Sequence, residues 1–107
     1  MSLPRWSADE MEQAIATGDA VLVDLRADWC PQCGPQERVL ERVLPTFDER
    51  VRFGSVDVEV NTTVVDDYHV KGLPTLLVFR DRRHHSTLAG FKRAPEVRQA
   101  LEAVLQA

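Results

Sequence analysis

The sequence predicts an α/β protein with a central mixed β-sheet and helices on both of its faces. Strand-like and helix-like segments alternate over the first two thirds of the chain, which favours parallel pairing of the strands. A very short connection then joins the last two strand-like segments, as in an antiparallel hairpin. The 107 residues are enough for one modest hydrophobic core. We therefore expect a single domain over residues 1–107.

Three elements are expected in the first half of the chain. Residues 7–10 have the Ser-x-x-Glu pattern of a capping box, which predicts a helix from this point. The apolar run at residues 20–25, interrupted only by Asp24, predicts a buried strand. Residues 33–44 place apolar side chains on one helical face. Pro45 should bend or end that helix, because its ring removes a backbone donor.

Five more elements are expected in the second half. Residues 51–58 largely alternate between apolar and polar and predict a strand. Asn61 is a candidate N-cap for a short helix that runs to residue 68. Residues 76–79 and 84–88 form the hairpin, with a turn between them. Pro at residue 95 suits the start of a closing helix whose apolar face continues to residue 105.

Charge and hydropathy exclude several classes of function. The net charge is −4, which gives no reason to expect binding to nucleic acid or to an anionic membrane. No apolar run approaches the roughly 20 residues that cross a bilayer. The N-terminal residues lack a basic stretch followed by an apolar one, so no secretion signal is indicated. We therefore expect a cytoplasmic monomer that binds neither nucleic acid nor membrane.

Cys30 and Cys33 carry the clearest chemical signal, and they are the only two cysteines. They lie where a strand-like segment gives way to a helix, and a helix N-terminus favours a thiolate. Residues three apart on a helix are close enough for a disulfide. A bridge across so small a loop adds little stability. The pair is therefore predicted to be redox-active, with Cys30 as the exposed attacking thiol and Cys33 as the partly buried resolving thiol.

Two other interpretations of the cysteine pair stay open at this point. The two thiols could be inert and buried, or they could form half of a metal site. Zinc sites usually need four ligands, and only His69, His84 and His85 could join the cysteines. None of these has the spacing of a ligand pair with the cysteines. We therefore expect no metal, and dithiol chemistry needs no bound cofactor.

The chain resembles the thioredoxin family over nearly its whole length, roughly residues 7–105. The resemblance rests on four segments of this sequence. They are Val-Leu-Val-Asp at residues 21–24, Ala-Asp-Trp-Cys-Pro-Gln-Cys at residues 27–33, Gly-Leu-Pro-Thr at residues 72–75, and Gly90. A Cys-x-x-Cys motif alone is a moderate signal. Together with the preceding Asp and Trp and the later Leu-Pro-Thr, it is a strong one.

The resemblance implies a substrate groove beside the cysteines. It implies a cis peptide bond before Pro74, which would place this segment against the two sulfurs, where its backbone pairs with an extended substrate. The alternative is an ordinary trans proline at the start of a strand. An apolar platform for partner proteins is expected around the sulfurs, formed by Trp29, Pro31, Leu73, Pro74, Gly90 and Phe91.

Asp24 matches the family's buried carboxylate beneath the resolving cysteine. Its place in the middle of an apolar run independently favours burial, which is costly for a carboxylate unless it is paired or protonated. The implied role of Asp24 is to take and return the proton of Cys33. The alternative is an acid on the solvent-facing side of a strand.

The sequence also departs from the family pattern. Pro31 and Gln32 stand between the cysteines, where thioredoxins proper carry Gly-Pro. These residues influence the redox potential, so we assign Gln32 a redox-tuning role. Ser55 stands where many members have a lysine near the buried acid.

Arg26 stands where thioredoxins commonly have a tryptophan. It shares a strand face with Asp24 by two-residue periodicity. We expect Arg26 to lie under the active-site loop, to pair with Glu59 or Asp24, and to tune the redox pair by favouring the Cys30 thiolate. The alternative is a surface arginine lying over the edge of the sheet.

These observations predict a thiol–disulfide oxidoreductase that reduces disulfides in partner proteins. Recycling would need an external thiol reductase. Two alternatives are a disulfide oxidase or isomerase on the same fold, and a module that binds through the Leu73-Pro74 groove without turnover.

Overall fold

The computed structural model of the chain describes residues 3–106. The predicted α/β class is confirmed, and every predicted helix and strand is present. In chain order the elements are α1 (Ala8–Ala16), β1 (Ala20–Arg26), α2 (Cys33–Val43), the 3-10 segment η1 (Leu44–Arg50), β2 (Val51–Asp57), α3 (Thr63–Asp67), β3 (Thr75–Arg80), β4 (Arg83–Ala89) and α4 (Ala94–Leu105).

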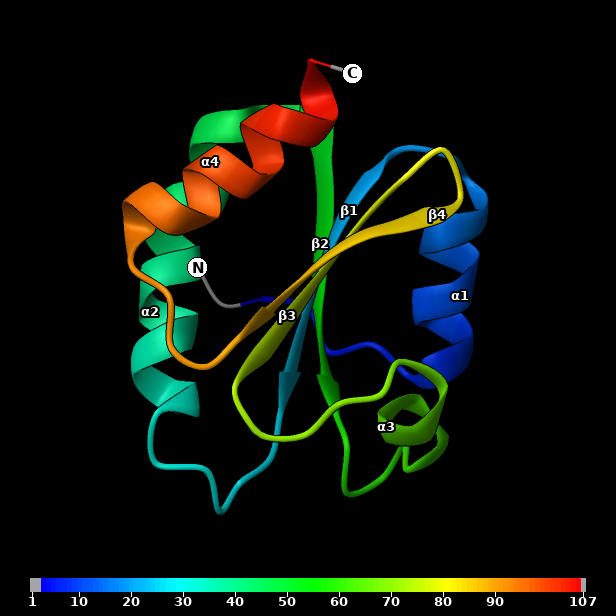
Figure 1. Ribbon diagram of the computed structural model, residues 1–107, viewed down its shortest axis with the longest axis vertical. Helices are drawn as coiled ribbons and strands as arrows, with labels where there is room; N and C mark the ends of the chain where they lie inside the picture. Colours follow the sequence, from blue (N-terminus) through cyan, green and yellow to red (C-terminus); the bar gives the residue numbers. More distant parts are fainter. Residues whose placement is uncertain (1–2, 107) are drawn as a thin grey trace.

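The four strands form one mixed sheet in the order β2-β1-β3-β4 (Figure 1). β1 pairs with β2 in parallel, and β3 is antiparallel to both β1 and β4. The parallel pair arises because α2 connects β1 to β2, whereas the tight turn after β3 forces a hairpin. The predicted mixed sheet is therefore confirmed.

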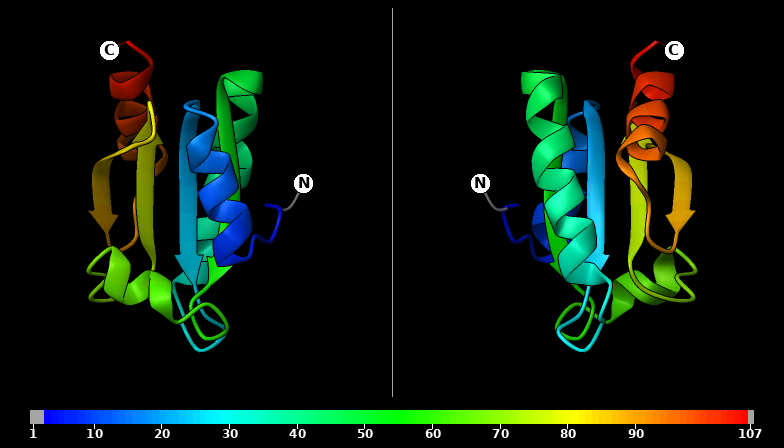
Figure 2. Two further views of the ribbon diagram at one scale, coloured as in Figure 1. Left: turned by 90° about the vertical axis from the view of Figure 1, so that its right-hand side faces the viewer. Right: turned by 90° about the vertical axis from the view of Figure 1, so that its left-hand side faces the viewer.

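Helices cover both faces of the sheet. α2 and α4 lie on one face, and α1 and α3 lie on the other (Figures 1 and 2). Each pair of helices closes its own hydrophobic core over the sheet. Strand β1 supplies both cores, because its successive side chains point to opposite faces. Leu22 faces α2 and α4, whereas Val21 and Val23 face α1 and α3.

The N-terminal segment lies along the outer edge of β2. The backbone of Ser55 bonds on both sides of Arg5, because its N–H donates to the Pro4 carbonyl at 2.8 Å and its carbonyl accepts from the Trp6 N–H at 2.7 Å. The Trp6 ring covers Gly54, and a side chain at Gly54 would overlap this ring. The close approach explains why the alternation of apolar and polar residues breaks at this point of β2.

Local signals located the helix ends with one exception. The capping box at Ser7 and Glu10 is present, and α2 ends just before Pro45. The prediction that Asn61 caps the short helix is wrong, because Thr62 occupies that position. The Asn61 side chain instead accepts from the Ala8 N–H at 2.9 Å and donates to the Asp57 carbonyl at 3.0 Å. It therefore ties α1 to the end of β2.

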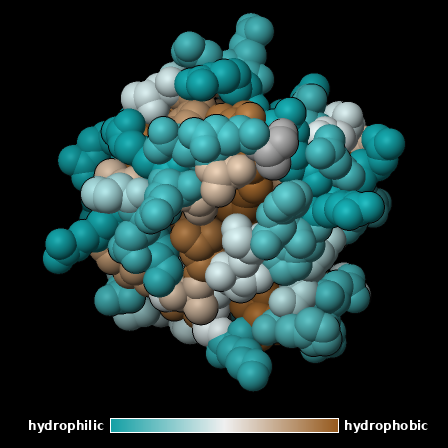
Figure 3. Space-filling model, turned by 45° about the horizontal axis from the view of Figure 1, so that its top comes forward, coloured by the Kyte–Doolittle hydropathy of each residue, from teal (hydrophilic) through white to brown (hydrophobic). Residues whose placement is uncertain are grey.

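On the face seen in Figure 3, hydrophobic side chains form a narrow, interrupted strip between hydrophilic ones. Strand β4 is the least buried strand of the sheet. Within residues 3–106, no helix is long and apolar enough to span a bilayer.

Candidate active site

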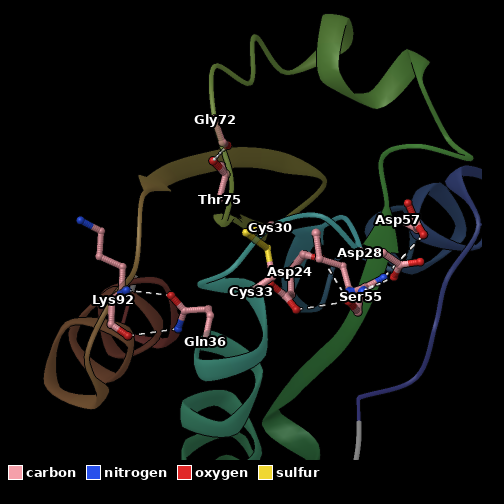
Figure 4. The surroundings of a disulfide bond; sticks show 11 residues. Asp24, Asp28, Cys30, Cys33, Gln36, Ser55, Asp57, Gly72, Thr75 and Lys92 are labelled. Carbon is pink, nitrogen blue, oxygen red and sulfur yellow. Dashed lines mark hydrogen bonds and ion pairs between the residues drawn. A yellow bond between two sulfur atoms is a disulfide. The ribbon is translucent and has the colours of Figure 1, made fainter.

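The two cysteines meet at the end of the sheet where β1 stops. Cys30 lies in the loop that follows β1, and Cys33 is the first residue of α2. Their Cα atoms are 5.4 Å apart and their sulfurs form a disulfide (Figure 4). Cys30 is 7% exposed and Cys33 is 3% exposed. The expectation of an exposed Cys30 is wrong for this oxidised state, because Trp29 and Pro31 beside it take the solvent-facing positions.

The second cysteine, Cys33, is the first residue of α2. Gln32 is the N-cap residue and its side chain makes no capping hydrogen bond. The first turn of α2 also contains no acidic residue. The positive end of the helix dipole is therefore not offset by a carboxylate in that turn, and it favours negative charge on a nearby sulfur.

Asp24 lies buried among the side chains around the disulfide (Figure 4). It is 0% exposed, which excludes the alternative of a solvent-facing acid. Its Oδ2 accepts a hydrogen bond from the Ser55 hydroxyl at 3.2 Å, and its Oδ1 has no hydrogen-bond partner among the described residues. Burial raises the pKa of Asp24 to about 7, against a smaller lowering by the bond from Ser55. Asp24 is thus poised to gain or lose a proton near neutral pH.

The segment before β3 reaches the same end of the sheet as the cysteines. The antiparallel register places Thr75 beside Leu25 at the end of β1, and Ala89 of β4 beside Thr75. The Leu73-Pro74 peptide bond is cis, as expected. The Thr75 hydroxyl donates to the Gly72 carbonyl at 2.6 Å, which closes this turn (Figure 4).

The segment after β4 reaches the same end of the sheet. The Gly90 N–H donates to the Pro74 carbonyl at 2.9 Å, so the segment after β4 lies against the cis-proline turn. Gly90 has a φ of +83°, which its missing side chain makes accessible. Trp29 is 64% exposed and Phe91 is 36% exposed. Large apolar side chains therefore face solvent next to Cys30 and next to Gly90.

Comparison with known proteins identifies the family. The family model for thioredoxin matches residues 3–103. The chain belongs to the thioredoxin family. The thioredoxin of Alicyclobacillus acidocaldarius subsp. acidocaldarius is 30% identical over 95 residues, which cover 89% of this chain and 90% of that protein. The thioredoxin of Staphylococcus epidermidis is 28% identical over 102 residues, which cover 95% of this chain and 97% of that protein.

Solved structures agree with this assignment. A mutant thioredoxin from Halobacterium salinarum NRC-1 superimposes with a TM-score of 0.86 at 25% identity, over 97% of this chain and 91% of that chain. Together with the Cys30–Cys33 disulfide, the family assignment makes this chain a thiol–disulfide oxidoreductase with a redox-active cysteine pair that acts on protein disulfides. The family assignment therefore excludes two of the earlier alternatives, namely inert buried thiols and a binding module without turnover.

Within this thioredoxin fold, the predicted partners of Arg26 are wrong. Its guanidinium pairs with Asp28 at 2.7 Å and with Asp57 at 3.5 Å. Asp57 is the register partner of Arg26 in the parallel pair of strands, whereas Glu59 lies beyond the end of β2 and is exposed. The guanidinium of Arg26 lowers the pKa of Asp28. Arg26 is thus tied through Asp28 to the loop that carries Cys30, and through Asp57 to the end of β2.

Sequence analysis missed Gln36, a buried amide in α2. Gln36 is 0% exposed, its Nε2 donates to the Lys92 carbonyl at 3.0 Å, and its Oε1 accepts from the Lys92 N–H at 2.7 Å (Figure 4). The amide thereby fixes the chain segment that carries Gly90 and Phe91 against α2. One signal was available, because Gln36 stands three and four residues before the apolar positions 39 and 40 and so lies on the buried face.

No group of three or more His, Cys, Asp or Glu side chains able to hold a metal ion occurs within residues 3–106. Sequence analysis also missed Arg5, whose Nη1 donates to the Ser55 hydroxyl at 2.8 Å, because nothing local in the sequence links residue 5 to residue 55.

Proposed function

We propose that the cysteine pair works in the reducing direction and passes two electrons to disulfides of partner proteins. The observation that carries this proposal is Asp24, a fully buried acid with a pKa of about 7 and with one oxygen that has no hydrogen-bond partner within residues 3–106. A resolving thiol must lose a proton before it can attack, and a buried acceptor of this kind can take that proton at neutral pH.

The proposed reaction has two exchange steps. The Cys30 thiolate attacks one sulfur of the substrate disulfide, which breaks the S–S bond, releases one substrate thiolate and leaves a mixed disulfide. Cys33 then gives its proton to the Asp24 carboxylate and attacks the Cys30 sulfur. The second substrate thiolate leaves. The two substrate thiolates then take up the proton that Asp24 gives back and the proton that Cys30 had lost to solvent. The protein ends as the Cys30–Cys33 disulfide, and the substrate has gained two electrons and two protons.

We propose that substrates bind in the groove between the active-site loop and the cis-proline turn. Support comes from the exposed Trp29 beside Cys30, and from the exposed Phe91 next to Gly90, whose N–H donates to the Pro74 carbonyl. An extended substrate segment would pair with the backbone near Pro74, while apolar contacts add binding energy. The residues assigned to this role are Trp29, Pro31, Leu73, Pro74, Gly90 and Phe91.

Recycling and location are further proposals. We infer that an external thiol reductase regenerates the dithiol, because the chain has no cysteines besides Cys30 and Cys33. A cytoplasmic monomer without nucleic-acid or membrane partners stays a prediction, which the net charge of −4 and the use of both cysteines in one motif support.

A second candidate function is disulfide oxidation or isomerisation. The sequence between the cysteines favours keeping it, because Pro31 and Gln32 differ from the Gly-Pro of thioredoxins proper. Gln32 and Arg26 are the residues that we propose to tune the redox pair.

The redox potential of the pair distinguishes the two directions. Equilibration with glutathione should give a value near that of thioredoxin, about −270 mV, whereas a value near that of protein disulfide isomerase, about −180 mV, would favour the second candidate. An insulin reduction assay should show turnover in the parent protein and none in Cys30→Ser. Cys33→Ser should retain the attack and accumulate the mixed disulfide, which mass spectrometry detects.

A further inference from the structure

We propose that Arg5, on the N-terminal segment, acts through the Ser55 hydroxyl as a positioning residue that holds Asp24 toward its ionised form, and that Glu37 opposes it. This inference rests on the proposed role of Asp24 as the proton acceptor of Cys33. It adds a control on the proton step that lies outside the active-site loop and the cis-proline turn.

The backbone fixes Arg5 opposite Ser55. The two hydrogen bonds of Ser55, to Pro4 and Trp6, flank Arg5 and make it the register partner of Ser55 at the edge of the sheet. Because register partners carry their side chains on the same face, the side chain of Arg5 is directed to that of Ser55. Arg5 is thus held in place by backbone bonds that a side-chain substitution leaves intact.

A hydrogen-bond chain connects Arg5 to Asp24. The Arg5 Nη1 donates to the Ser55 Oγ at 2.8 Å, and the Ser55 Oγ lies 3.2 Å from the Asp24 Oδ2 and 3.3 Å from the Asp24 carbonyl. A guanidinium only donates, so the serine oxygen accepts from Arg5 and its own hydrogen is free for Asp24. A hydroxyl polarised in this way is a stronger donor to a carboxylate. Ser55 is 0% exposed, which limits competition from water.

Glu37 opposes the effect of Arg5 and favours the protonated form of Asp24. Its Oε2 lies 3.4 Å from both Nη1 and Nη2 of Arg5, so it shares the cation with Ser55. Its negative charge also raises the pKa of Asp24, whereas the positive charges of Arg5 and Arg26 lower it. Arg26 is already held by Asp28 and Asp57. The cation linked to Asp24 by hydrogen bonds is therefore Arg5.

Cys30 and Cys33 do not titrate in the oxidised protein, because both are in the disulfide. Charged groups face Asp24 from the N-terminal segment (Arg5), from β1 (Arg26) and from α2 (Glu37). A titration of the oxidised protein therefore isolates the effects of these side chains on Asp24.

The test is a carbon-13 NMR titration of the Asp24 carboxyl in the oxidised protein. Arg5→Gln should raise the pKa of Asp24 by about half a unit, since a half-exposed charge is partly screened by solvent. Arg5→Lys should restore much of the difference. Glu37→Gln should lower the pKa of Asp24. The matched control is Arg52→Gln, which removes another arginine of the β2 edge that pairs with Asp19 at 2.8 Å and should leave Asp24 unchanged.

A double-mutant cycle tests the path through the hydroxyl. In Ser55→Ala the backbone bonds to the N-terminal segment remain, and the pKa of Asp24 should rise above its parent value because a donor is lost. Adding Arg5→Gln to Ser55→Ala should then shift the pKa of Asp24 by less than half of the shift that Arg5→Gln causes in the parent. An undiminished shift would overturn the path through Ser55. An Arg5→Gln titration that matches the parent would overturn the whole proposal.

These outcomes are separate from the failure of the proposed function. If Asp24 titrates as expected in all variants but Asp24→Asn resolves mixed disulfides at the parent rate, the link from Arg5 stands and the role of Asp24 as proton acceptor fails.

Discussion

The two sides of the disulfide are held together by different kinds of hydrogen bond. The acid side, formed by Asp24, Ser55, Arg5 and Glu37, is a chain of side chains that ends in a buried oxygen without a partner among the described residues. The groove side, formed by the cis-proline turn and the segment after β4, is held by hydrogen bonds to its backbone from Gln36, Gly90 and Thr75.

This difference matches two separate tasks. Moving a proton requires a group whose charged and neutral states are close in energy, and a buried acid with an open oxygen meets that need. Binding varied protein substrates requires a fixed surface, and satisfied backbone bonds supply it. The comparison predicts that changes on the acid side alter pH dependence, whereas changes on the groove side alter substrate binding.

The largest effect on stability is expected from Asp24→Asn. Asp24 has a folded pKa of about 7, above its ordinary value of 3.8, so the folded protein holds a proton that the unfolded chain loses. The free energy of unfolding of the parent should therefore fall as pH rises from about 4 to about 7 and level off above that. Asp24→Asn has no carboxyl group to titrate and so does not lose this stability. Its free energy of unfolding should exceed that of the parent by roughly 2–4 kcal/mol at pH 8.

Urea unfolding of the two oxidised proteins at pH 4 and pH 8 measures this difference. The difference in free energy of unfolding between the two proteins should be small at pH 4 and large at pH 8. An equal gap at both pH values would mean that Asp24 does not carry the predicted shift.

A smaller effect, on the groove side, is expected from Gln36→Leu. The change leaves the Lys92 N–H and carbonyl without their partner in a buried site, which costs about 1–3 kcal/mol of the free energy of unfolding. The segment with Phe91 loses its anchor, so KM for a protein disulfide should rise more than kcat falls. The pH midpoint of the resolving step should stay unchanged.

Gln13→Leu is the matched control, because Gln13 is an exposed glutamine in α1. It should change neither stability nor KM appreciably. If Gln36→Leu lowers stability while KM stays at the parent value, Gln36 does not position the groove.

The smallest effect is expected from Arg26→Gln. Its guanidinium is divided between Asp28 and Asp57, so little of its charge is left to act on the acid side. NMR titration should show the pKa of Asp28 rising toward its ordinary value, and the pKa of Asp24 rising by less than in Arg5→Gln. A larger shift of Asp24 from Arg26→Gln would reverse our ranking of the two arginines.

The sequence located what depends on local pattern. An acid inside an apolar run was correctly predicted to be buried, and a capping box and two prolines marked helix ends. Side-chain contacts between neighbouring strands could not be predicted, because they depend on strand register and not on local sequence. Arg26 met Asp57 because of the register between β1 and β2, and Arg5 met Ser55 across 50 residues of chain. Gln36 was overlooked because a helical face predicts burial and not a partner on another segment.

The most direct test of the account is the pH dependence of the resolving step in the parent and in Asp24→Asn. Rapid mixing of reduced protein with excess dithiobis-nitrobenzoate releases one thionitrobenzoate on attack by Cys30 and a second on resolution by Cys33. We predict that the rate of the second release in the parent rises through a step near pH 7, the pKa of Asp24. We predict that Asp24→Asn lacks this step and rises only as the Cys33 thiol itself ionises. The same step in both proteins would contradict the assignment of Asp24 as the proton acceptor.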